Sequence, residues 1–195
     1  SGGTGTEEDP YIITTETQLR DMVNKAEAHF KLGNNITLTQ NWTPVGTSEA
    51  PFTGTLDGQG YKISGLKITS GSYRGLFGYV ENGAVIKNLE IENASITGSS
   101  YLGILAGQAT AFQEISNIVI TGGTVSGTTN VGGLIGKAMG SSTTSKINNV
   151  GVTNINVTGS SYRVGGLIGE IESGSGKKIL IEKVYTTGNV TGSYE

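Results

Sequence analysis

The apolar residues of this chain recur in the same short pattern about every thirty positions. Four segments place aliphatic residues between glycines, as in NVGGLIGKAMG, which begins at Asn130. The central leucines are separated by 29, 29 and 33 positions, and the closing glycines keep the same steps. The leucines are Leu76, Leu105, Leu134 and Leu167, and the closing glycines are Gly78, Gly107, Gly136 and Gly169.

Two further motifs repeat in step with the first. The second starts at Ile86, Ile115, Ile147 and Ile181, and the third ends at Gly98, Gly127, Gly159 and Gly192. Each segment is short and alternates apolar with polar residues, which is typical of strands. A unit of about thirty residues cannot bury its apolar face alone, so successive units must stack. We therefore predict an all-β fold, a right-handed parallel β-helix (β-solenoid) with three short strands per coil.

Stacking puts equivalent side chains directly above one another. We expect the four leucines to form one interior ladder, with the flanking glycines turning through positive φ or approaching neighbouring backbone closely. Asn88, Asn117 and Asn149 share the third place of the second motif, where they are expected to form a hydrogen-bonding ladder at a corner. Lys183 interrupts that series in the last unit.

The N-terminal region differs from the repeats and resembles a cap. Thr15 and Gln18 have capping-box spacing, and the apolar residues that follow have helical spacing, which predicts an α-helix over about residues 15–28. We assign residues 1–40 to a cap with this helix and a first strand, and residues 41–195 to the coils. The last residues, Gly192 to Glu195, stand where another glycine–leucine segment is expected, so we expect the solenoid to continue in a longer parent protein.

Composition narrows the class of protein. Charged residues make up 15% of the chain, cysteine is absent and the formal net charge is −3. Without a basic run, nucleic acid is not an expected partner. No segment approaches the length of about 20 apolar residues that a membrane span needs.

The glycine–leucine segments resemble the GLUG motif of bacterial surface proteins. They read GLFG from Gly75, GILAG from Gly103, and GGLIG from both Gly132 and Gly165. The resemblance implies a secreted or cell-wall-attached bacterial protein, a class that includes adhesins and the non-catalytic parts of immunoglobulin-A-cleaving metallopeptidases. It implies no particular ligand, because the motif is a packing signature.

Catalytic chemistry is not expected in this chain. It has one histidine, His29, and three aspartates, Asp9, Asp21 and Asp57, all before the regular repeats. Facing carboxylate pairs, nucleophile–base pairs and His/Cys zinc sites are therefore not predicted, although TLDGQG resembles a stretch of β-helical polysaccharide lyases and hydrolases. Neither a cofactor nor a metal is predicted; the acidic run from Glu7 to Asp9 is interpreted as a solvated loop, with calcium binding as the alternative.

A row of aromatic residues is the candidate binding feature. Tyrosines follow Gly-Ser turns at one place of the repeat, where Asn130 replaces the middle member, and two arginines come directly after them. Such a row can stack on sugar rings, or it can cover a corner of the solenoid and hydrogen-bond locally. The candidate binding residues are Tyr73, Tyr101, Tyr162, Tyr194, Arg74 and Arg163.

Two functions fit these observations. The first is an extracellular surface module that acts as an adhesin or a rigid spacer presenting a binding face. The second is a carbohydrate-binding module of a larger secreted enzyme that uses the tyrosine row. The expected partner is a host or bacterial surface protein or glycan, and the sequence does not predict an oligomeric state.

Overall fold

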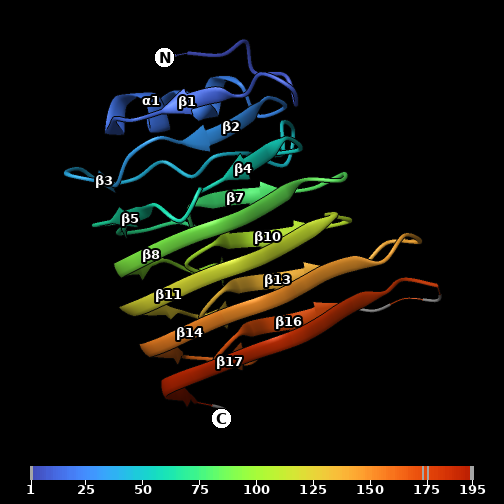
Figure 1. Ribbon diagram of the computed structural model, residues 1–195. Helices are drawn as coiled ribbons and strands as arrows, with labels where there is room; N and C mark the ends of the chain where they lie inside the picture. The colour runs from blue at the N-terminus through green and yellow to red at the C-terminus, as the bar shows by residue number, and fades with distance from the viewer. Residues whose placement is uncertain (1, 173, 175, 194–195) are drawn as a thin grey trace.

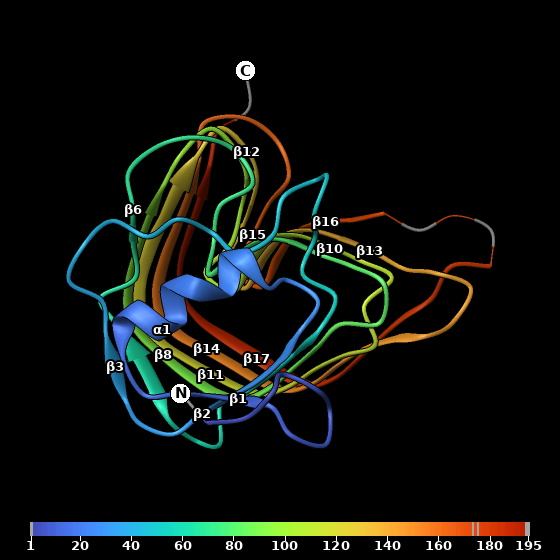
Figure 2. The ribbon, with the colours of Figure 1, turned by 90° about the horizontal axis from the view of Figure 1, so that it is seen from above.

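The computed structural model describes residues 2–172, 174 and 176–193, and its strands wind into a parallel β-solenoid of about five turns (Figure 1). Seen from the N-terminal end, the chain runs clockwise as it moves away from the viewer, so the winding is right-handed (Figure 2). The predicted fold class is confirmed.

The strands are short before the regular coils and alternate in length within them. In chain order they are β1 (Tyr11–Ile13), β2 (His29–Leu32), β3 (Ile36–Thr37), β4 (Thr55–Asp57), β5 (Lys62–Ser64), β6 (Lys67–Ile68), β7 (Phe77–Val80), β8 (Val85–Thr97), β9 (Ser100–Leu102), β10 (Ala106–Thr110), β11 (Glu114–Gly127), β12 (Thr129–Gly132), β13 (Ile135–Met139), β14 (Ser145–Gly159), β15 (Val164–Gly165), β16 (Ile168–Glu172) and β17 (Ile179–Gly192). The helical segments are α1 (Glu16–Arg20) and the 3-10 helix η1 (Asp21–Asn24).

Each regular coil adds one strand to each of three parallel sheets. The large sheet carries β8, β11, β14 and β17 side by side, a second sheet carries β7, β10, β13 and β16, and a third carries β9, β12 and β15. The first two of these series are visible as stacked arrows in Figure 1. Because each strand pairs with its counterpart one coil away, backbone hydrogen bonds run along the solenoid axis.

The division of each coil into strands differs from the prediction. The predicted second and third strands form one bent strand, such as β8, which β4, β5 and β6 contact in turn along its length. Its bends lie at Asn88 and Asn93, whose φ angles are 55° and 52°. The predicted first strand is instead two, β9 and β10 in the second coil, because the chain turns sharply between them. At both bends the alternation is interrupted by two consecutive outward residues, Lys87-Asn88 and Glu92-Asn93; the prediction placed a corner at Asn88 but treated the segments on either side as separate strands.

The interior is a continuous apolar column. Leu76, Leu105 and Leu134 are at most 1% exposed, and Leu167 is partly buried in the last coil. Ile86, Ile115, Ile147 and Ile181 form a second column through successive register pairs. Equivalent apolar side chains therefore cover one another from coil to coil, which is how a repeat too small to fold alone gains a core.

The cap is shorter and more tightly wound than predicted. Helix α1 has five residues, with Thr15 as its N-cap, and η1 follows it, in place of one helix over about residues 15–28. The backbone leaves the helical path after Asn24, because the Ala26 carbonyl accepts hydrogen bonds from Thr53 N and Gly54 N of the neighbouring loop. The tighter 3-10 turn leaves Val23 41% exposed, whereas Leu19 and Met22 remain buried.

The cap and the long loops occupy the places that a solenoid requires. Helix α1 lies across the N-terminal end of the coils (Figure 2), where it covers apolar residues of the first turn. The loop between β13 and β14 projects from one corner of the cross-section (Figure 2). Extra residues are thus accommodated outside the strand ladders.

Leu134→Asp is expected to prevent folding, because it places a carboxylate inside the apolar column at a cost of several kcal/mol. Thr124→Asp is the matched control, since Thr124 lies on the solvent side of β11 and its replacement is expected to cost less than about 0.5 kcal/mol. Circular dichroism and urea unfolding distinguish the two. Equal stability of both variants would show that the interior column is misassigned.

Candidate functional site

The tyrosine row lies at an inward corner of the coil, which we call the elbow, within or directly beside the short strands of the third sheet (β9, β12, β15) and a few residues before the strands of the second (β7, β10, β13, β16). One residue per coil forms this corner in the left-handed conformation, with φ of 55° to 65°. Register pairs align the four elbow residues in one column along the axis. They are Tyr73, Tyr101, Asn130 and Arg163.

The glycines that close the repeat are needed because two coils meet at the elbow. A Cβ on Gly107 would lie 2.5 Å from the carbonyl carbon of Tyr73, and a Cβ on Gly136 would lie 2.5 Å from that of Tyr101. Neither glycine has a positive φ. These glycines were expected either to adopt positive φ or to allow close approach of neighbouring backbone. Here they allow close approach, and the residues with positive φ are the elbow residues.

The structure corrects the membership of the tyrosine row. Asn130 N donates to the Tyr162 carbonyl and Val131 pairs with Val164, so Arg163 takes the elbow position and Tyr162 precedes it. Leu167 is five positions after Tyr162, whereas Leu105 is four after Tyr101, and the additional residue shifts Tyr162 out of the column. Tyr162 is 55% exposed beside the row.

Arg74 does not lie at the elbow surface. Arg74 turns back, with its Nε donating to the Ser70 carbonyl at 3.0 Å and its guanidinium lying over Gly71. Tyr194 lies outside the described residues. The structure thus brings together Tyr73, Tyr101 and Arg163 of the six predicted binding residues.

A second column faces the elbow residues from the neighbouring sheet. Its members come directly after the closing glycines, which is the signal that identifies them in the sequence. Register pairs align these residues across β7, β10, β13 and β16. They are Tyr79, Gln108, Lys137 and Glu170. Sequence reasoning missed this column, because its residue types change from coil to coil.

In the first coils the facing columns form an aromatic stack. The ring centroids of Tyr73 and Tyr79 are 4.5 Å apart, and those of Tyr73 and Tyr101 are 4.4 Å apart with an interplanar angle of 8°. Burial raises the pKa of the Tyr79 hydroxyl, and its hydrogen bond with Tyr73 raises this pKa further. Because the rings cover one another's faces, the stack stabilises the corner and both faces of Tyr73 are taken.

In the last coils the same columns form a network of charges. Glu170 receives a hydrogen bond from Asn130 Nδ2, and its carboxylate forms ion pairs with Arg163 Nε at 3.0 Å and with Lys137 Nζ at 3.7 Å. Lys137 also contacts Glu172 at 2.5 Å. This hydrogen bond lowers the pKa of Glu172 and raises the pKa of Lys137. Every charged group of the network has a partner of opposite charge, so these ion pairs hold the last coils together at the elbow.

The asparagine corner forms a ladder along the large sheet. Asn149 Nδ2 donates to Asn117 Oδ1 at 2.8 Å, Asn117 Nδ2 donates to Asn88 Oδ1 at 2.9 Å, and Asn88 Nδ2 donates to Asp57 Oδ1 at 3.0 Å. The three asparagines and Lys183 all have φ between 52° and 55°. Asparagine tolerates this conformation and its amide can both donate and accept, so one residue type serves the bend and the ladder.

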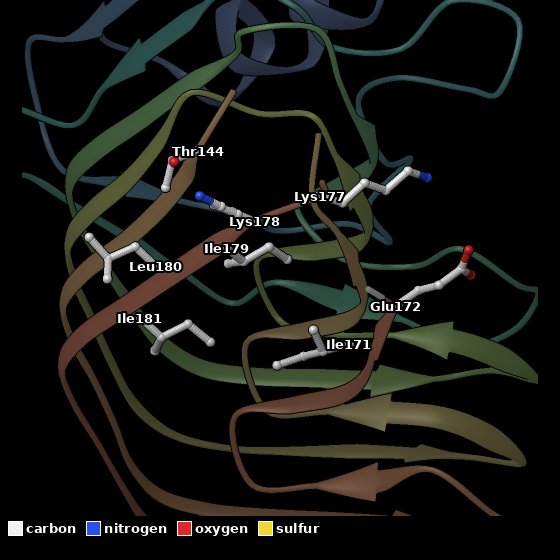
Figure 3. A pocket seen from close by; sticks show the side chains of 9 residues that line it. Thr144, Ile171, Glu172, Lys177, Lys178, Ile179, Leu180 and Ile181 are labelled. Carbon is white, nitrogen blue, oxygen red and sulfur yellow. The ribbon is translucent and has the colours of Figure 1, made fainter. Parts of the chain in front are cut away.

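A largely apolar pocket of about 560 Å³ lies between β16 and β17 (Figure 3). Ile179 and Ile181 point toward Ile171 from the facing strand, whereas Leu180 points away. The pocket continues the apolar interior into the last coil and brings together no pair of carboxylates. Within the described ranges, no three His, Cys, Asp or Glu side chains are close enough to share a metal ion.

Two curated proteins resemble about half of this chain. One is named as a Gly-rich membrane protein of Evansella cellulosilytica, 35% identical over 121 residues, which are 55% of this chain and 14% of that protein. The other is Halomucin of Haloquadratum walsbyi, 36% identical over 119 residues, which are 54% of this chain and 1% of that protein. The chain therefore spans only a small fraction of the length of either relative. Surface-type proteins thus contain sequence of this kind.

Comparison with protein-family models and with solved structures assigns neither a family nor a known fold to the chain. No protein-family model matches the chain, and no solved structure matches it. In the described part of the chain, no helix has the length and apolarity needed to cross a membrane.

Gly107→Ala is expected to destabilise the protein by about 1–3 kcal/mol, because the new methyl group would overlap the Tyr73 backbone. That backbone is held by its hydrogen bond to the next coil, from Tyr73 N to the Ser100 carbonyl, and cannot move without breaking it. Gly192→Ala is the control, since a Cβ there meets only Val164 side-chain atoms at 3.6 and 3.7 Å. Chemical denaturation measures both. A neutral Gly107→Ala would contradict the close approach at the elbow.

Lys137→Met is expected to lower the free energy of unfolding at neutral pH. Because the pKa of Glu172 is lowered in the folded protein, its ion pair stabilises the fold fully above the usual glutamate pKa of about 4.3. This contribution is lost as pH falls through the lower pKa of the folded state. The raised pKa of Lys137 adds stability that is lost only as pH rises through it, above about 10.4. The deficit of the variant should therefore shrink between about pH 7 and about pH 3 in urea titrations. The same deficit at both pH values would assign it to packing.

Proposed function

We propose that this chain is a non-catalytic, extracellular surface module of the GLUG type, which acts as a rigid spacer or adhesin and presents a binding face. The observation that carries the proposal is the continuous parallel pairing from β8 through β11 and β14 to β17, in which β14 and β17 have one register shift between Val152 and Ile155. Hydrogen bonds along the axis resist bending and stretching without disulfides, which suits a part that holds other domains away from a cell.

The relatives support a surface location. One carries the word membrane in its name and the other is named Halomucin, and this chain corresponds to a small part of each. A stacked module of this kind is used in long proteins as one segment among others. We infer a secreted or wall-attached parent protein, whose partner is a surface protein or a glycan.

Binding is proposed to occur on the broad sides of the solenoid. At the elbow the tyrosine rings stack on one another and the charged groups form ion pairs with one another. These contacts favour a structural role for that corner. For the second candidate function, a carbohydrate-binding module, we therefore propose a binding surface other than the elbow, on the outer face of the large sheet.

Antibodies raised against the chain are expected to label intact cells of the organism that produces it. Labelling is expected to disappear when intact cells are treated with a protease that digests the denatured chain. An antibody against a cytoplasmic protein is the control for leakage. Labelling that appears only after lysis would contradict the proposed location.

A further inference from the structure

The outer face of the large sheet carries an aromatic ring laid over a glycine. Tyr185 of β17 pairs with Gly151 of β14 and is 58% exposed. A Cβ on Gly151 would lie 2.6 Å from both Cζ and Oη of Tyr185 and 3.0 Å from Cε1. The end of the phenol ring therefore occupies the space directly above the Gly151 backbone. Gly151 has no positive φ, so turn geometry does not explain this glycine, whereas the ring that covers it does.

The same column continues with an apolar residue in the next coil. Val119 of β11 pairs with Gly151 and is 41% exposed. Sheet pairing places these residues about 4.8 Å apart along the axis, on long strands that lie side by side (Figure 1). Val119 and Tyr185, on either side of the covered Gly151, thus form an exposed apolar strip, which we call the Tyr185 strip.

Polar side chains border the strip on both sides. Asn117 and Asn149 lie two positions before Val119 and Gly151, and Thr121 and Thr153 lie two positions after them. Asn149 Oδ1 ends the amide ladder, and among the described residues it has no hydrogen-bond donor. The border thus offers amide and hydroxyl groups to a ligand on the strip, and the exposed Lys183, two positions before Tyr185, adds an ammonium group.

The strip leads into a hollow nearer the N-terminal end. This hollow has a volume of about 450 Å³ and shares Asn117 and Val119 with the strip. Its other lining residues are Gln59, Gly60, Asn88, Leu89 and Glu90. A chain-like ligand that lies along the solenoid axis can therefore contact the ring, then Val119, and then the polar groups of the hollow.

This arrangement matches the chemistry of a pyranose ring. One face of a pyranose presents C–H groups, which pack on an aromatic ring, and its rim presents hydroxyls, which bond to amides and hydroxyls at the edges. We propose that the Tyr185 strip binds pyranose units of a glycan chain. The proposal deepens the binding role proposed above, because it names a ligand class and a face.

The test uses arrays of neutral and acidic oligosaccharides, followed by titration calorimetry with a glycan that binds. The intact chain is expected to bind at least one glycan, and Tyr185→Ala is expected to weaken that binding by about tenfold or more. Gly151→Val, which displaces the ring, should weaken it similarly. Tyr162→Ala removes an exposed tyrosine outside the strip and should bind like the unchanged protein.

Two results would overturn the proposal: no binding of any glycan by the folded protein, or unchanged binding by Tyr185→Ala. Circular dichroism and thermal unfolding verify that each variant is folded. Failure here leaves the surface location untouched, because antibody labelling of intact cells does not depend on Tyr185.

Discussion

Register between successive coils is the constraint on which this structure depends. Each long strand pairs in parallel with its counterpart, so an interior residue such as Ile115 has an isoleucine above and below it. A coil placed one residue out of register would turn its apolar residues to solvent. The repeat in the sequence is therefore a direct consequence of how the backbone hydrogen bonds are made.

The corners follow from the same constraint. A chain that returns to the same position in every coil must bend at the same place, and these bends use left-handed residues at the asparagine ladder and at the elbow. At the elbow the backbone of one coil presses on the next, which leaves room only for glycine at positions such as Gly107. The glycine–leucine segment thus combines an interior leucine with a contact point between coils.

Period and alternation were sufficient to predict the winding, the interior leucines and the bent corner of asparagines, because each recurs in every coil. Features that occur once were harder to predict. The cap helix ends early because Ala26 bonds to a loop distant in sequence, and Tyr162 leaves the row because of one additional residue before Leu167. The Tyr185 strip was not predicted, because Gly151 has no side chain to mark the position as part of a surface. Its role follows only from its pairing with Val119 and Tyr185 on the neighbouring strands, which the structure shows.

The function proposed for this module rests on the stacking of coils, so the most direct measurement is of that stacking. The chain has no cysteine, so pairs of cysteines can be introduced without interference. Ser126→Cys with Thr158→Cys joins register partners, whereas Ser126→Cys with Asn156→Cys is offset by two residues. The account predicts a disulfide in the first pair under mild oxidation and none in the second, whose Cα atoms are separated by more than about 7 Å. Equal bridging of both pairs, or bridging of the offset pair alone, would contradict it.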